Sequence, residues 1–122
     1  MKVLLGIGGS PDSFRALSTG LERARAAGDE LTVAILENPE SDVDPAEVEA
    51  RVRDELKASA VDASVRRLSG DPGGALIKLA EAEHFDAIAL GGGQESPMGK
   101  IRLGSIAEFV ILNSSVTVIL LR

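Results

Sequence analysis

Stretches of apolar residues recur along the chain at intervals that predict β-strands separated by helices. Continuous apolar runs occupy residues 1–8, 30–37, 85–92 and 116–122, and a β-branched, alternating segment occupies 61–68. Continuous runs of this length, ended by glycine or polar residues, are typical of parallel strands buried on both faces. The charges within 61–68 instead favour a strand at the edge of a sheet. The pattern therefore predicts five strands.

Between these strands, apolar residues recur at the three- and four-residue spacing of an amphipathic helix. Three helices are predicted to begin with a capping residue followed by proline, namely at Ser10-Pro11, Asp44-Pro45 and Asp71-Pro72. For the fourth helix, Ser105 and Glu108 have the spacing of a capping box. The predicted apolar stripes are Phe14, Leu17, Leu21 and Ala24, then Val48, Val52 and Leu56, then Leu76, Leu79 and Ala80, and finally Ile106, Val110 and Ile111.

The alternation of strands and helices predicts one α/β domain over residues 1–122, with a parallel sheet and right-handed crossovers. Runs 1–8 and 85–92 are the two most hydrophobic before the C-terminus and are expected in the centre. The resulting order is 3-2-1-4-5, a five-stranded open sheet with helices on both faces, as in Rossmann-like folds. The first and fourth strands then meet at a topological switch point, where open α/β sheets bind ligands. The connections at that point are residues 8–12 and 91–105, and we expect a site between them.

The second of these connections carries features that attract an anion. The three glycines at 91–93 let the backbone approach a ligand closely. Gly104 and Ser105 open a helix whose first N–H groups lack partners within the helix. Lys100 and Arg102 add positive charge, although cations in loops are usually only solvated. The connection is therefore a candidate phosphate site.

No standard motif of catalysis or phosphate binding fits the chain. Gln94 and Ile101 break the P-loop pattern, and Pro11 breaks the dinucleotide-binding fingerprint. His84 is the only histidine, and we expect it to be structural at a helix C-terminus, where the dipole favours a cation. Neither a nucleophile–base pair nor paired carboxylates are evident, so an enzyme is the least favoured class and any ATP hydrolysis is expected to be slow.

The chain resembles the universal stress proteins, of the adenine nucleotide alpha hydrolase-like superfamily. Members carry G-x2-G-x9-G-[ST] after their fourth strand, and the corresponding residues here are Gly91-x2-Gln94-x9-Gly104-Ser105. Further matches in the same order are Gly9-Ser10, Gly70-Asp71-Pro72 and the segment SPMGK-x3-GS. The resemblance covers the whole chain.

The resemblance implies a regulatory module of the stress response that binds an adenine nucleotide, ATP or AMP, with Mg²⁺ accompanying the nucleotide. It implies no catalytic residue and no metal site made by the protein alone. Ser10 and Ser105 are as well explained by helix capping as by phosphate contact. The nucleotide-binding residues we expect are Gly8, Gly9, Ser10, Leu36, Gly91, Gly92, Gly93, Gln94, Gly99, Lys100, Gly104 and Ser105.

Two residues depart from the pattern of nucleotide-binding members. Gly8 stands where those members carry an aspartate, and Gln94 replaces a glycine. A lost acceptor and a bulkier, less permissive backbone position together lower the expected affinity about tenfold to a hundredfold. The alternative hypothesis is therefore a stress-family dimer that no longer binds nucleotide and acts through contacts with other proteins.

Composition and charge narrow the range of partners. The net charge of −6 and an aromatic content of 2% argue against nucleic-acid binding. The chain has no cysteine, which suggests a cytoplasmic protein, and its apolar runs are too short for a signal peptide or a membrane span.

The last strand, 116–122, would expose an apolar edge if the protein were monomeric. Since family members dimerise through this strand, we expect a homodimer, with further protein partners unknown; the alternative is that its short length and Arg122 protect the edge.

Overall fold

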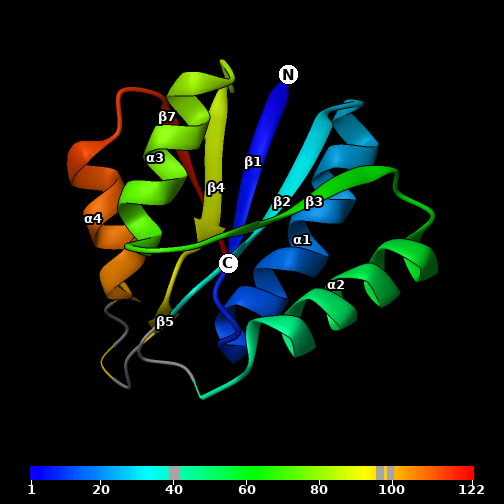
Figure 1. The fold of residues 1–122 in the computed structure, drawn as a ribbon, viewed down its shortest axis with the longest axis horizontal. Coiled ribbons are helices and arrows are strands. Elements are labelled where there is room, and N and C mark those ends of the chain that lie inside the picture. The colour runs from blue at the N-terminus through cyan, green and yellow to red at the C-terminus, as the bar shows by residue number, and fades with distance from the viewer. Residues whose placement is uncertain (39–41, 96–97, 99–100) are drawn as a thin grey trace.

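A five-stranded parallel sheet with strand order β3-β2-β1-β4-β7 forms the centre of the protein (Figure 1). The computed structural model describes residues 1–38, 42–95, 98 and 101–122. This order confirms the predicted arrangement 3-2-1-4-5, with β1 hydrogen-bonded to both β2 and β4. The carboxyl ends of β1 and β4 therefore lie side by side. The strands are β1 (Lys2–Ile7), β2 (Glu30–Leu36), β3 (Ala63–Leu68), β4 (Ala87–Gly91) and β7 (Thr117–Leu121).

The helices begin close to where the capping signals predict. They are α1 (Pro11–Ala27), α2 (Pro45–Ser59), α3 (Pro72–Ala82) and α4 (Ser105–Asn113). Ser10, Asp44 and Asp71 are the N-caps of α1, α2 and α3, and each side chain accepts a backbone N–H from the first turn. A proline follows each of these caps, as expected from its fixed φ and missing N–H.

Two apolar layers cover the two faces of the sheet. One cluster joins the inward residues of β1 and β2 to Leu17 and Leu21 of α1 and Val52 of α2. The other joins the opposite face of the sheet to Leu76 of α3 and Val110 of α4. In Figure 1, α1 and α2 accordingly lie on one side of the sheet and α3 and α4 on the other. The burial of β1 and β2 on both faces explains their continuous apolar sequences.

The connection between β4 and α4 contains regular structure that the sequence pattern does not predict. Two short strands, β5 (Gln94–Glu95) and β6 (Ile101–Arg102), pair antiparallel and form a separate two-stranded sheet. Two-residue strands carry too few positions to show an alternating pattern, so the sequence indicates only a polar loop there. The predicted fifth strand of the main sheet is consequently β7.

Candidate functional site

A cavity of about 280 Å³ opens at the carboxyl ends of β1 and β4, between the first turns of α1 and α4. It is slightly smaller than the common size range of small-molecule sites. Leu36 at the end of β2 and Leu90 in β4 contribute apolar walls, and glycines and serines line the rim. The two connections that the topology places at the switch point therefore meet around one hollow.

Most of the predicted nucleotide-binding residues for which the structure gives side-chain surroundings line this cavity. These are Gly8, Ser10, Leu36, Gly91, Gly93, Gly104 and Ser105. Gly9 lies instead in a neighbouring groove beside Pro11 and Phe14 of α1. Gly92 faces the end of β7, where its N–H donates to the carbonyl of Leu121 at 2.7 Å. Nucleotide contact by any of these residues remains a prediction.

Three further predicted binding residues, and the neighbouring cation Arg102, are described in part or not at all. The backbone of Gln94 lies in β5, and the structure does not describe its side-chain surroundings. Gly99 and Lys100 lie outside the described residues. Arg102 belongs to β6, again without described side-chain surroundings.

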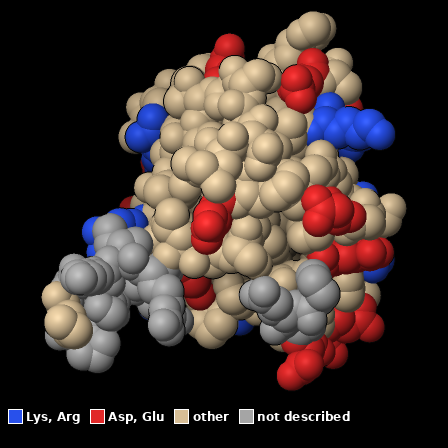
Figure 2. Space-filling model, turned by 90° about the vertical axis from the view of Figure 1, so that its left-hand side faces the viewer, with Lys and Arg blue, Asp and Glu red and all other residues tan. Residues whose placement is uncertain are grey.

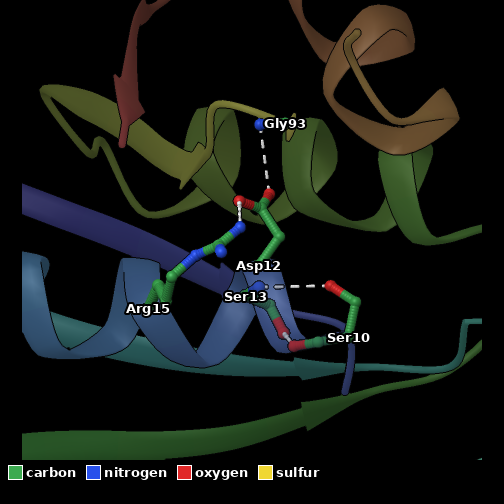
Figure 3. A network of polar contacts seen from close by, with 5 residues as sticks. All are labelled: Ser10, Asp12, Ser13, Arg15 and Gly93. Carbon is green, nitrogen blue, oxygen red and sulfur yellow. Dashed lines mark hydrogen bonds and ion pairs between the residues drawn. The ribbon is translucent and has the colours of Figure 1, made fainter. Parts of the chain in front are cut away.

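Asp12 links the turn after β1 to the segment after β4 through a hydrogen bond to Gly93 (Figure 3). This role is not apparent from the sequence. Oδ2 of Asp12 accepts the N–H of Gly93 at 3.1 Å, and its Oδ1 accepts Nη2 of Arg15 at 3.1 Å. A Cβ added at Gly91 would lie 3.0 Å from Cγ of Asp12 and closer still to Oδ2. Gly91 is therefore needed because the carboxylate occupies the space beside it. An acidic residue in a first helical turn is usually explained by the helix dipole alone, and no local signal predicts a contact across 81 positions.

The first turn of α1 is closed by its own cap. Oγ of Ser10 accepts the N–H of Ser13 at 3.1 Å, and Oγ of Ser13 donates to the carbonyl of Ser10 at 2.8 Å. That carbonyl also accepts the N–H of Phe14. The capping reading of Ser10 is thus confirmed, although Ser10 still lines the cavity.

The first turn of α4 is built differently, and the predicted capping box is wrong. Gly104 is the N-cap, with φ −70° and ψ 160°, and no side chain caps the helix. Ser105 is the first helical residue, which moves Glu108 one position too far along for a reciprocal cap. Within the described part of the chain, no residue accepts the N–H of Ile106 or Ala107, and both residues line the cavity. The amides at this helix end are therefore available to an anion.

Gly8 lies at the opposite side of the cavity, next to Asn38. Nδ2 of Asn38 donates to the carbonyl of Gly8 at 3.2 Å. A Cβ at Gly8 would lie 3.2 Å from that same nitrogen, the far end of a flexible side chain. A Cβ at this position would consequently fit after a small movement of Asn38.

The cavity wall is more apolar than polar and carries almost no charge. Among its described lining residues, Asp12 is the only one with an ionisable side chain. The described residues hold no group of three or more histidine, cysteine, aspartate or glutamate side chains suited to a metal ion. No helix of the described chain combines the length and apolar character needed to cross a membrane. The arrangement offers hydrogen-bond donors and apolar contacts to a small ligand.

Comparison with known proteins agrees with this architecture. The sequence model of the universal stress protein family matches residues 1–122. A universal stress protein solved in complex with cAMP is 28% identical, with a TM-score of 0.77 over 99% of this chain and 95% of that one. The comparison with curated proteins gave no match.

Two more distant structures show the likeness of fold alone. The universal stress protein from Archaeoglobus fulgidus in complex with dAMP is 21% identical, with a TM-score of 0.75 over 100% of this chain and 98% of that one. The universal stress protein UspA from Lactobacillus plantarum is 16% identical, with a TM-score of 0.81 over 100% of this chain and 97% of that one.

Proposed function

Because this chain belongs to the universal stress protein family, we propose that it binds an adenine nucleotide, ATP or AMP, and acts as a regulatory protein of the stress response. The proposed site is the cavity at the carboxyl ends of β1 and β4. One observation carries the proposal: the first turn of α4 has no side-chain cap, and Ile106 and Ala107, whose N–H groups have no acceptor among the described residues, line that cavity. The cAMP complex of a relative supports an adenine ligand with a phosphate.

The proposed binding mode follows from the distribution of polar and apolar walls. The phosphate lies against the N-terminus of α4, where backbone N–H groups and the helix dipole favour an anion. The adenosine portion lies between Gly8, Leu36 and Gly91, where the wall is apolar and the backbone is bare. Gly99 and Lys100 belong to the proposed set by their sequence positions. When Mg²⁺ is present it arrives with the nucleotide, and we propose no catalytic step.

Isothermal titration calorimetry tests this function most simply. Protein freed of bound nucleotide is titrated with AMP and with ATP, each with and without Mg²⁺, and with GMP as a base control. Saturable binding of an adenine nucleotide in preference to GMP supports the proposal. Absence of heat, together with an unchanged melting temperature at millimolar nucleotide, contradicts it.

A second candidate function is a dimer that acts through protein contacts without nucleotide. Gly8, the residue next to the proposed ribose, has no carboxylate to offer the ligand. Its backbone carbonyl accepts a hydrogen bond from the Asn38 side chain. Under this alternative, Gly8→Asp combined with Gln94→Gly creates AMP binding that the wild-type protein lacks. Binding by the wild-type protein alone rejects the alternative.

For either function we propose a homodimer that pairs through β7. β7 is an edge strand, and Leu120 within it is 39% exposed. On α4, Phe109 and Leu112 are also exposed, and Figure 2 shows an expanse with few charged groups on one side of the molecule. The other edge strand, β3, instead carries Arg66, which is paired with Glu83. An uncharged edge favours strand pairing, whereas a charged one opposes it.

Light scattering coupled to size exclusion tests the dimer. We expect twice the mass of 12.7 kDa for the wild-type protein and a monomer for Leu120→Lys. Ser64→Lys introduces a lysine at the other edge strand, β3. It is the control, and we expect it to leave the mass unchanged. A wild-type monomer contradicts the dimer. A cytoplasmic location is part of the same proposal, and cell fractionation tests it.

A further inference from the structure

The carboxylate of Asp12 lines the cavity and takes up one of the backbone N–H groups at its wall. It accepts the N–H of Gly93 at 3.1 Å, and Gly93 belongs to the glycine stretch that follows β4. That amide is one of the donors that a phosphate chain would need if it extended from α4 toward α1. The Asp12 carboxylate, a group of the protein itself, accepts this N–H (Figure 3).

The charge balance of the cavity strengthens this effect. Asp12 is the only ionisable side chain among the described lining residues, so their formal charge is negative. Its partner Arg15 leaves the carboxylate incompletely neutralised, because the Arg15 side chain is 61% exposed whereas that of Asp12 is 18% exposed. The cation is solvated and the anion is held in the cavity wall. Solvent screens exposed ion pairs strongly, so much of the repulsion from Asp12 persists inside the cavity.

The packing around Asp12 keeps the carboxylate in this position. Gly91 leaves room for it, and a Cβ at 91 would come within 3.3 Å of the Asp12 backbone oxygen as well. α1 also begins at Pro11, directly before Asp12, which fixes the backbone of this turn. The carboxylate is held in the wall by its hydrogen bonds to Gly93 and Arg15.

We propose that Asp12 sets the number of phosphates that the cavity accepts, favouring an adenine ligand with one phosphate and disfavouring ADP and ATP. The inference rests on the proposed function. A single phosphate is held by the amides of Ile106 and Ala107, at the open end of α4. Each further phosphate adds negative charge, approaches Asp12 and finds the Gly93 amide occupied. Asp12 is thus a determinant of specificity.

Calorimetric titration of Asp12→Asn with adenosine, AMP, ADP and ATP tests this inference. Asparagine keeps an oxygen for the Gly93 amide and removes the charge. We expect the wild-type protein to bind AMP more tightly than ADP, and ADP more tightly than ATP. In Asp12→Asn the ATP affinity rises about tenfold, the AMP affinity rises less, and the adenosine affinity stays the same.

Asp62→Asn is the matched control. It makes the same change of net charge at an exposed residue just before β3, at the edge of the sheet opposite the cavity. We expect it to change no nucleotide affinity by more than about twofold, since exposed charges beyond the Debye length are screened. Thermal unfolding shows whether each variant is folded.

The possible outcomes separate this inference from the proposed function. If neither protein binds any adenine ligand, the proposed function fails, and the inference fails with it. If AMP binds but ATP binds the wild-type protein more tightly, the function stands and the inference is overturned. The same holds if Asp12→Asn weakens ATP binding only with Mg²⁺, because Asp12 would then assist the metal. An equal rise for adenosine also overturns it, because the effect would not depend on phosphate.

Discussion

The first turns of α1 and α4 both border the cavity, but only one of them is closed by a side chain. In α1, Ser10 caps the helix and Pro11 follows, so few backbone donors remain. In α4, Gly104 holds the cap position without a side-chain bond, and no proline follows it. The helices α2 and α3 share the closed design of α1.

The difference between the capped N-terminus of α1 and the uncapped N-terminus of α4 indicates different roles for the two helix ends. A cap satisfies N–H groups that are otherwise unpaired at a helix start, and it stabilises the helix by about 1 kcal/mol. α4 lacks this contribution at the helix end that faces the cavity. A ligand anion would supply the missing acceptors, so binding and helix stability are coupled in α4 but not in α1. The following predictions test this comparison, from the largest expected effect on stability to the smallest.

The largest effect is expected from Gly91→Ala, which breaks the contact between the two sides of the cavity. The new Cβ would collide with Oδ2 of Asp12, so the carboxylate must leave the Gly93 amide. We expect the free energy of unfolding to fall by roughly 1–3 kcal/mol, as for other overpacked sites. Chemical denaturation measures the change.

Gly8→Ala is its control, because the added Cβ meets only the Asn38 side chain, and at no less than 3.2 Å. We expect it to cost well under half as much as Gly91→Ala. Equal costs at the two positions would show that the space beside Asp12 has no special importance.

Ser10→Ala removes the side-chain cap of α1 and is expected to lower the free energy of unfolding by about 1 kcal/mol. Asp71→Ala makes the corresponding change at α3, where the carboxylate accepts the N–H of Gly74 at 2.8 Å, and should cost a similar amount. Thermal unfolding of both variants gives the comparison. A Ser10→Ala variant as stable as the wild-type protein would mean that the cap of α1 contributes nothing.

Gly104→Ser gives α4 the closed design of α1 and is expected to have the smallest effect on stability. Its Oγ would accept the N–H of Ile106 or Ala107, which raises the free energy of unfolding by a few tenths of a kcal/mol. The same bond removes a donor from the ligand, so AMP affinity falls about tenfold. Calorimetry and thermal unfolding measure the two opposite changes.

Gly104→Ala separates amide competition from steric blockage. A Cβ at 104 meets nothing within 4 Å, and alanine has no hydroxyl to occupy the amides. AMP affinity should therefore stay within about twofold of the wild-type value. An equal loss in the serine and alanine variants would contradict competition for the amides.

The sequence predicts the fold well because its signals are local. Continuous apolar runs identify β1 and β4 as central strands, and each capping residue followed by proline marks a helix start to within one position. The hydrophobic pattern and the topological rules then suffice for the strand order. The pair β5 and β6 escapes prediction because strands of two residues have no measurable period.

The candidate site is only partly predictable, because its details depend on contacts between distant residues. The glycines at 91 and 93 and Gly104 were identifiable from spacing, and all three line the cavity. The bond from Asp12 to Gly93 joins separate connections and has no signature in either. The capping box of α4 is wrongly predicted because Ser105 and Glu108 have suitable spacing, whereas the backbone turns helical one residue earlier than a cap at Ser105 requires.

The most direct test of the account is to observe the backbone amides at both helix ends while AMP is added. In a ¹⁵N–¹H correlation spectrum, we predict that the Ile106 and Ala107 signals move and saturate with ligand, while the Ser13 signal, already bonded to Ser10, stays in place. Movement of the Ser13 signal without movement at Ile106 and Ala107 would contradict the claim that α4 receives the phosphate.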